Sequence, residues 1–371
     1  MSRSILFPHG FHRVSDYQMS RTRRNGFHEL WKPLAAVMLL LVSCLSARSA
    51  LYRTNGWTLQ ATLKLDKPSI LLGEPMSVTL RVTNHSEEDL EIIVGGTNGD
   101  YGGSISAFDS DGHKVPRPTI NLMMGGMYGP SKLPAKGCYD FRVFLPKSAR
   151  FERPGDYRIV STRTLEIIKP VPGRSFTEVP RTTIVATDSR QLRVLPHDTV
   201  KMGEVIESLG VRLRSDVEQT RADAAELLDF IQDERAVPHL AAAIRNEKQS
   251  LKVFNHALGA FGWSSTAEAL EGLKFGISTN RSQFSANSYL FDNIRHVAAH
   301  GLARSKNPEA LRHLVTFKHD LLSSVRLAVI QRVVWERNSE AKQILQDLSD
   351  DPDTMVRGEA RRLLKSISTP D

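Results

Sequence analysis

Cysteine is scarce in this chain, whose 371 residues contain only Cys44 and Cys138. A fold that depends on several disulfide bonds is therefore excluded, as is a zinc site built from paired Cys-x-x-Cys segments. The sequence also has no Gly-x-Ser-x-Gly motif, no phosphate loop and no dinucleotide-binding fingerprint. We therefore predict no catalytic residues, no metal and no cofactor.

An excess of one charge sign is also missing from most of the chain. The formal net charge is +8, but residues 1–50 hold seven Lys and Arg against two Asp and Glu. Residues 201–371 hold twenty-three of each sign. Because the positive excess lies mostly in the first fifty residues, the composition does not indicate a nucleic-acid partner.

The one long apolar run covers residues 34–47. As a helix it would rise roughly 21 Å, which is short of the ~30 Å hydrocarbon core that a spanning helix crosses. Basic residues at 21–32 precede it, and this order is typical of a signal peptide. We therefore predict a leader at residues 1–50. Translation from Met19 in place of Met1 would give that leader a more ordinary length.

Residues 41–44, Leu-Val-Ser-Cys, end the apolar run and resemble the lipobox of bacterial lipoproteins. The resemblance implies that the thiol of Cys44 carries a lipid, which would anchor the protein with ~0.8 kcal/mol per buried methylene. Cleavage after Ala47 or Ala50 would instead give a secreted protein, and an uncleaved run would give a single N-terminal membrane helix. We expect an exported protein of the cell envelope, either lipid-anchored or periplasmic.

The segment after the leader shows the alternation of β-strands. Apolar and polar residues alternate over residues 57–65 and again over residues 76–82. Further strand-like stretches, separated by turns rich in Gly, Pro and Asn, occur at residues 90–94, 104–108, 139–145, 157–162 and 183–195. We predict an antiparallel β-sandwich over residues 55–198.

Two short motifs of this segment resemble bacterial immunoglobulin-like domains. One is Leu-Gly-Glu-Pro at residues 72–75, leading into the strand at residues 78–84. The other is Arg-Pro-Gly-Asp-Tyr at residues 153–157, a turn followed by a tyrosine at the start of a late strand. The resemblance implies an immunoglobulin-like sandwich, a module that usually binds or spaces rather than catalyses.

Loops at residues 95–130 interrupt the strands. The glycine-rich residues 95–103 lack the Lys-Ser/Thr ending and the following helix of a phosphate loop. Met123, Met124 and Met127 offer thioethers of the kind that Cu(I) accepts, but no nearby His or Cys completes a ligand set. A contact surface is the expected role of these loops.

Beyond residue 196 the pattern is helical and repeats at an interval of 31 residues. Every repeat has a basic residue at the same position. The interval from 252 to 295 is longer because of a twelve-residue insertion at residues 276–287. The five basic residues are Arg221, Lys252, Arg295, Arg326 and Arg357.

This segment resembles the HEAT-like (PBS-lyase-type) helical repeats, whose first helix carries a Val-Arg-x-x-Ala-Ala signature. The resemblance implies an α-solenoid of about four and a half repeats over residues 200–368. In this family the repeated basic residue more often bridges to an acidic or carbonyl group of a neighbouring repeat than to a ligand, so a structural role is expected. Second helices are expected at residues 236–245, 266–275, 308–317 and 340–348.

Four further side chains of the helical segment could belong to a site. His296 and His300 are four residues apart, as metal ligands on a helix are, but no third ligand is evident. Trp263 and Trp335 lie near helix junctions. We expect the histidines to be polar helix positions and the tryptophans to pack.

The predicted fold class is multidomain, with a β-sandwich followed by an α-solenoid. Because both parts resemble scaffolds, we expect a non-enzymatic, membrane-tethered protein that binds a protein partner through the solenoid. The alternative is an envelope enzyme or enzyme accessory with a small-molecule or metal site in the 95–130 loops. HEAT-like repeats also occur in proteins that handle tetrapyrrole chromophores, which adds a lyase or cofactor-inserting protein as a third option.

Overall fold

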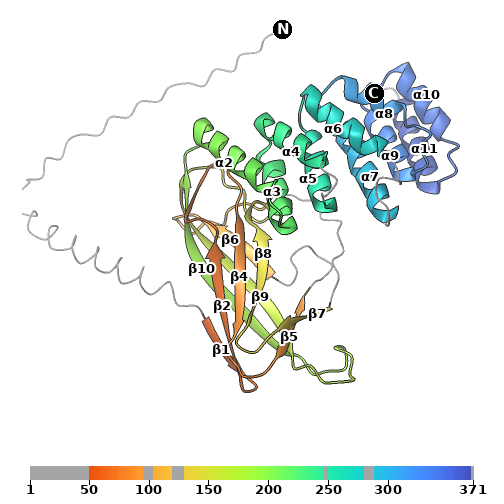
Figure 1. The fold of residues 1–371 in the computed structure, drawn as a ribbon. Coiled ribbons are helices and arrows are strands. Elements are labelled where there is room, and N and C mark those ends of the chain that lie inside the picture. Colours follow the sequence, from red (N-terminus) through yellow and green to blue (C-terminus); the bar gives the residue numbers. More distant parts are fainter. Residues whose placement is uncertain (1–49, 95–102, 119–128, 246–249, 280–287, 369–371) are drawn as a thin grey trace, which may run out of the picture. The chain divides into compact units, whose positions relative to one another are not determined.

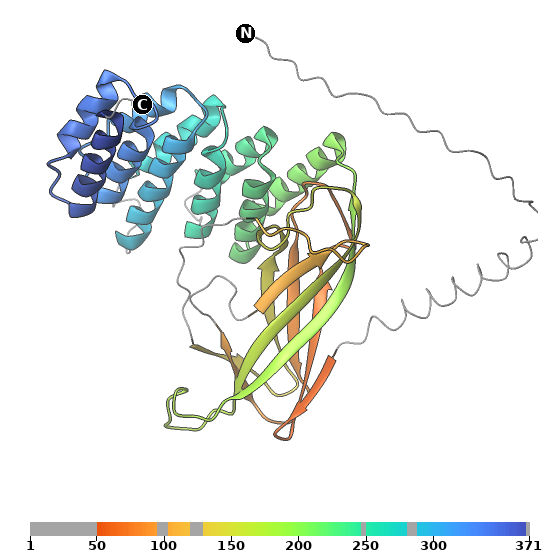
Figure 2. The same ribbon diagram turned by 180° about the vertical axis from the view of Figure 1, so that it is seen from behind.

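The computed structural model describes residues 50–94, 103–118, 129–245, 250–279 and 288–368. Residues 49–371 form one compact unit (Figures 1 and 2). Cys44, the glycine-rich residues 95–102 and the three methionines at 123–127 lie outside the described residues. None of the described helices is both long and apolar enough to span a bilayer.

The first sheet of the β region is antiparallel throughout. Its strand order is β1-β2-β4-β8. The alternation predicted at residues 57–65 is the burial pattern of β2, in which every second side chain faces the core. The strands are β1 (Ala50–Thr54), β2 (Trp57–Leu65), β4 (Ser77–Asn84) and β8 (Cys138–Phe144).

The second sheet is mixed, so the prediction of purely antiparallel strands was wrong. Its order is β3-β10-β9-β5-β7, and β6 pairs with β9. The short β3 runs parallel to the end of β10, although β2 and β4, which flank it in sequence, lie in the first sheet. The strands are β3 (Ser69–Leu71), β5 (Leu90–Val94), β6 (Gly103–Phe108), β7 (Gly129–Leu133), β9 (Gly155–Ile168) and β10 (Thr182–Leu195).

Apolar side chains of the two sheets meet in two separate clusters. The first sandwich cluster includes Leu63, Ile159 and Leu192, and the second includes Leu59, Leu165 and other residues nearer the opposite ends of the strands. Each cluster draws on strands from both sheets, which is what makes the β region a sandwich. An immunoglobulin-like topology stays a prediction.

The helical region is a stack of antiparallel helix pairs (Figure 1). In each pair the first helices contact the first helices of the neighbouring pairs, and α4, α6 and α8 form a second layer. The first helices are α3 (Glu218–Ile231), α5 (Leu251–Phe261), α7 (Ser288–Arg304), α9 (Ser323–Val333) and α11 (Thr354–Ser368). The second helices are α4 (Val237–Ile244), α6 (Ala267–Ser278), α8 (Glu309–Val315) and α10 (Ser339–Leu348).

Small residues set the spacing of these helices. A Cβ added at Gly262 of the α5–α6 turn would lie 3.1 Å from the Cα of Gly301 in α7. One apolar cluster then runs through the whole stack, from Met202 to Leu363. No single pair has enough apolar surface to fold alone, so each pair depends on its neighbours.

The sandwich and the helix stack share this apolar cluster. Leu71 and Phe144, both from the β region, belong to it together with the apolar residues of α2 (Thr199–Arg212). The ring of Phe144 meets that of Phe230 edge to face at 5.3 Å. Beside it, Lys147 pairs with Glu226 at 2.6 Å. The β region therefore covers the apolar end that the first helices would otherwise expose to water.

Candidate functional site

Three of the repeated basic residues hold the turn that precedes their own helix. Arg221, Arg326 and Arg357 each donate a hydrogen bond to the backbone carbonyl six residues earlier, which belongs to Ser215, Asp320 and Asp351, respectively. The common spacing arises because the side chain folds back along the first turn of its helix. The guanidinium thus provides a hydrogen-bond donor for a carbonyl group of the turn, outside the hydrogen-bond ladders of the helices.

Two of the five basic residues, Arg295 and Arg326, contact the turn that follows their repeat. Arg326 donates two hydrogen bonds of 2.7 Å to the carboxylate of Asp351, twenty-five residues later, and both side chains are buried. Arg295 donates one hydrogen bond to the carboxylate of Asp320, again twenty-five residues later. The hydrogen bond to Asp351 raises the pKa of Arg326, against the effect of burial.

The five basic residues therefore differ in what they do. Four have their guanidinium groups directed into the stack, as described above. Lys252 is the exception, because its side chain is exposed. We call the pairs Arg295–Asp320 and Arg326–Asp351 clamps. Sequence reasoning did not predict their aspartates. The recurrence of Asp320 and Asp351 at a 31-residue interval was the signal that could have found them.

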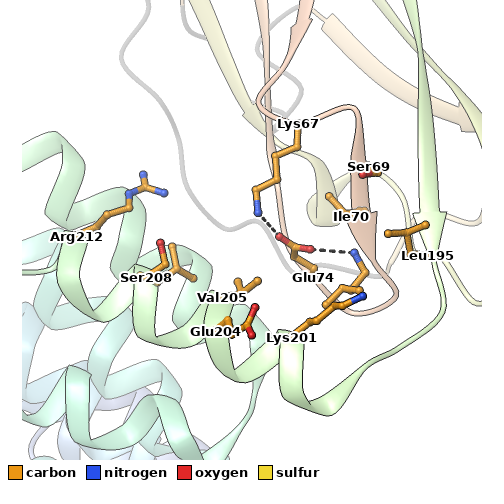
Figure 3. A pocket seen from close by; sticks show the side chains of 12 residues that line it. Lys67, Ser69, Ile70, Glu74, Leu195, Lys201, Glu204, Val205, Ser208 and Arg212 are labelled. Carbon is orange, nitrogen blue, oxygen red and sulfur yellow. Dashed lines mark hydrogen bonds and ion pairs between the residues drawn. The ribbon is translucent and has the colours of Figure 1, made fainter.

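A groove of about 410 Å³ lies between the β3–β4 turn and α2 (Figure 3). On the sandwich side, Glu74 is buried, accepts a hydrogen bond from the backbone N–H of Leu71 and pairs with Lys67. On the α2 side, Lys201 lies 3.7 Å from Asp198. Since most of its charged groups are already paired, we interpret the groove as the seam between the sandwich and α2.

Arg212, at the end of α2, is the one cation of this groove for which the described part of the chain has no ion-pair partner. Burial lowers its pKa, and the nearby guanidinium of Arg142 lowers it further, against the attraction of Asp66. Arg142 itself pairs with Asp223 and lies 3.8 Å from Asp66. Arg142 and Arg212 thus both lie near the carboxylate of Asp66, at the joint where the sandwich meets the helix stack.

Asp109, Asp111 and His113 bring one possible metal ligand each to within 4.8 Å of one another. The turn that they form explains this closeness without an ion. The carboxylate of Asp109 accepts hydrogen bonds from the backbone N–H groups of Asp111 at 3.0 Å and His113 at 2.8 Å. Asp111 and His113 are exposed, so this is an aspartate-stabilised turn at the surface.

His296 and His300 lie on one face of α7, with ring centroids 4.5 Å apart. Burial lowers the pKa of both, and that of His300 falls to about 4 because His296 and Arg304 add to the effect of burial. Among the described residues, no third ligand joins them in a metal cluster. Burial therefore favours the neutral form of both rings, which are partly buried on α7.

Three of the exposed large apolar side chains lie in the last two repeats, whereas others lie in α2, in α3 and in the sandwich. Leu321, in the turn before α9, is 94% exposed, and Met355, in α11, is 71% exposed. The expectation that Trp335 packs was wrong, since its side chain follows α9 and is 79% exposed. Trp263, in the equivalent turn of an earlier repeat, does pack against the apolar cluster.

Residues 290–365 match the family model described as HEAT repeats. The match spans α7 to α11 and confirms, for this segment, the repeats predicted from the 31-residue interval. A search of curated proteins finds no match to the chain.

Two solved structures to which the chain is similar each cover less than half of it. A designed armadillo repeat protein in complex with the peptide (KR)4 is 16% identical over 46% of this chain and 84% of that chain, with a TM-score of 0.30. Human deoxyhypusine hydroxylase in complex with glycerol is 18% identical over 44% of this chain and 84% of that chain, with a TM-score of 0.19. Residues 290–365 are HEAT repeats, and repeats of this kind usually mediate protein interactions.

Proposed function

We propose that this protein is an exported, membrane-tethered interaction scaffold without enzymatic activity. In this proposal the leader directs export, Cys44 carries the lipid, and the helix stack binds a protein partner. The observation that carries the proposal is the exposure of Leu321, Trp335 and Met355 within the HEAT-repeat segment. Tryptophan is among the residues that contribute most binding energy at protein interfaces, and methionine is enriched there.

The charges around these side chains fit a solvent-facing surface. Arg332 pairs with Glu336 at 2.6 Å beside Trp335, and Asp350 and Arg361 form an exposed pair near the start of α11. A polar surrounding around a few exposed apolar residues is the usual arrangement of an interface that forms between separately folded proteins. The partner would therefore dock on a surface that is already ordered before binding.

The test is cross-linked co-purification of the full-length protein from its native envelope fraction. Trp335→Ser and Leu321→Ser should each reduce recovery of a discrete partner at least tenfold. Val200→Ser is the matched control, because Val200 is 73% exposed on α2 but lies outside the HEAT-repeat segment. Recovery of the same proteins with all three variants, or of no partner with the unchanged protein, would contradict the proposal.

Tethering is tested separately with Cys44→Ala. This substitution removes the thiol that would carry the lipid, so the protein should move from the membrane fraction to the soluble fraction. Metabolic labelling with a radioactive fatty acid should mark the unchanged protein and not the variant. An unlabelled protein would remove the lipid from the proposal and leave partner binding unaffected.

A further inference from the structure

The groove between the β3–β4 turn and α2 has the size and the lining of a small-molecule site (Figure 3). Its volume of about 410 Å³ is typical of such sites, which often lie where two separately packed parts of a protein meet. Ile70 and Leu71 of β3 and Leu209 of α2 line it and are buried. Leu195 and Val205, both half-buried, line it as well. An occupant would therefore meet an apolar floor.

Two polar side chains of α2 line the same groove. Ser208 and Arg212 are four residues apart, so they lie on one face of the helix (Figure 3). Among the described residues, neither side chain has a hydrogen-bond partner. Lys67, on the sandwich side, is different because it pairs with Glu74. The hydroxyl of Ser208 and the guanidinium of Arg212 are thus the donors that an occupant would find free.

The surroundings of Arg212 lack negative charge. Its guanidinium is half-buried and has five N–H donors. Burial and the nearby Arg142 together outweigh the attraction of Asp66, and the pKa of Arg212 is lowered as a result. Asp66 is also 3.8 Å from Arg142, so its charge acts on both arginines. A further negative charge in the groove would therefore stabilise the guanidinium.

A carboxylate is the group that fits this position best. It is planar, and it can accept two parallel N–H groups of a guanidinium at once. Because Ser208 lies one turn away on the same face of α2, its hydroxyl can donate to the same group. The remainder of the molecule would then cover the apolar floor and remove it from water.

The other end of the groove disfavours a second negative charge. Glu204 lies two turns before Arg212, roughly 12 Å along the helix, and it lines the groove without an ion-pair partner among the described residues. Lys201 is near the same end but is already 3.7 Å from Asp198. Glu204 would thus repel the far carboxylate of a diacid.

We infer that this groove binds an amphipathic monocarboxylic acid, whose carboxylate pairs with Arg212 and whose apolar part lies over Val205 and Leu195. Such a ligand contacts both the sandwich and α2, so it stabilises the joint between them. The site is separate from the exposed side chains of the last two repeats and does not depend on the proposed scaffold function.

The test measures the Tm of the full-length protein with hexanoate as the probe and chloride at the same ionic strength as the reference. Saturating hexanoate should raise the Tm by about 1–3 °C, because a ligand that binds only the folded state stabilises it. Acetate lacks the apolar part, and adipate carries a second carboxylate. Each should need at least a threefold higher concentration for half of its effect.

Two variants locate the binding site. Arg212→Met removes the guanidinium and should abolish the rise, and Ser208→Phe should do the same by filling the groove while Arg212 stays in place. Ser208 is exposed, so this variant keeps the core unchanged. Arg214→Met is the matched control, since Arg214 is an exposed arginine two residues later that does not line the groove. It should keep the full rise.

The proposal is overturned if the unchanged protein shows no rise with hexanoate, or if Arg212→Met keeps a rise of equal size. A rise with acetate or sulfate as large as that with hexanoate would reveal a general effect of anions and overturn it as well. Adipate that acts at the concentrations of hexanoate would contradict the assigned orientation of the ligand along α2.

Discussion

At the scale of single residues, two buried arginines show how differently the fold treats the same group. Arg326 is 8% exposed and has a bidentate carboxylate, whereas Arg163 is 6% exposed and has an aromatic ring. Burial works against the charge of both. In Arg326 the hydrogen bond to Asp351 outweighs the effect of burial and raises the pKa. In Arg163 the effect of burial is the larger one and lowers the pKa.

The clamp in the last repeats gives a first prediction. Asp351→Asn should lower the free energy of unfolding by about 3–5 kcal/mol, because it leaves the buried Arg326 without its counter-charge. Asp350→Asn is the control, since the neighbouring Asp350 forms an exposed pair with Arg361 and should change stability by ~0–1 kcal/mol. Urea denaturation of both variants measures the difference, and equal effects would contradict the clamp.

His300 gives a prediction about pH. Its pKa in the folded protein is lowered to about 4 by burial, His296 and Arg304, whereas the unfolded chain has an ordinary value near ~6.5. The unfolded state therefore binds more protons between these values, and stability should fall as pH drops from ~6.5 towards 4. His300→Gln should flatten this part of the stability–pH curve. If the slope of stability against pH, measured by denaturation at each pH, is the same in His300→Gln as in the unchanged protein, the prediction is wrong.

Sequence reasoning found part of this picture at the residue scale. The 31-residue interval identified all five repeated basic residues, but their hydrogen-bond acceptors depend on where the chain turns. Arg163 was missed, although its signal was present. It occupies the position in the period-two series of β9 at which an apolar side chain is expected between Ile159 and Leu165.

At the scale of elements, the packing of first helices against second helices depends on glycine. A Cβ at Gly272 in α6 would lie 2.3 Å from the ring of Phe261, which is fully buried and cannot move aside. The close approach of α5 and α6 is thus possible only without a side chain at this position.

Gly272→Ala should therefore lower the free energy of unfolding by about 1–3 kcal/mol, as overpacking does. Gly358→Ala in α11 should have the opposite sign, because a Cβ there meets nothing within 4 Å and alanine favours the helix by about 0.5–1 kcal/mol. Thermal unfolding of the two variants decides the matter, and two shifts of the same sign would refute the packing argument.

Among the elements, the long and regular ones were predictable. The period-two pattern located β2 and β4, and the strand-like stretches between turns located β10 and the first half of β9. The helical repeat located the second helices to within a few residues. β3 was not predicted as a parallel strand, because three residues carry no usable period. β1 was missed as well, since its five residues follow the leader directly and lie ahead of the predicted boundary at residue 55.

At the scale of the whole molecule, the joint between strands and helices determines how the protein unfolds. Phe144 is 7% exposed and belongs to the apolar cluster of the helix stack, although it ends a strand of the sandwich. Residues 81 apart, Arg142 and Asp223, pair across the same joint. Such contacts cannot be read from local patterns, so the sequence indicated two parts but not their connection.

Because the two parts share this cluster, the unchanged protein should unfold in one calorimetric transition. Phe144→Ala should lower stability by about 3–5 kcal/mol and separate the unfolding of the helices from that of the sandwich. Leu133→Ala is the control, because Leu133 is fully buried inside the sandwich and should lower stability without separating the transitions. Two transitions in the unchanged protein would show that the joint does not couple its parts.

The clamps between repeats have a consequence for how such a chain can evolve. Each clamp joins a basic residue to an aspartate twenty-five positions later, across the boundary between two repeats. A duplication or deletion of one whole 31-residue repeat keeps every clamp, because the new neighbours bring the same partners. An insertion or deletion of any other length between the two residues of a clamp would leave a buried guanidinium without its carboxylate. Relatives of this protein should therefore differ in length by whole repeats, while shorter insertions should fall outside the clamped spans.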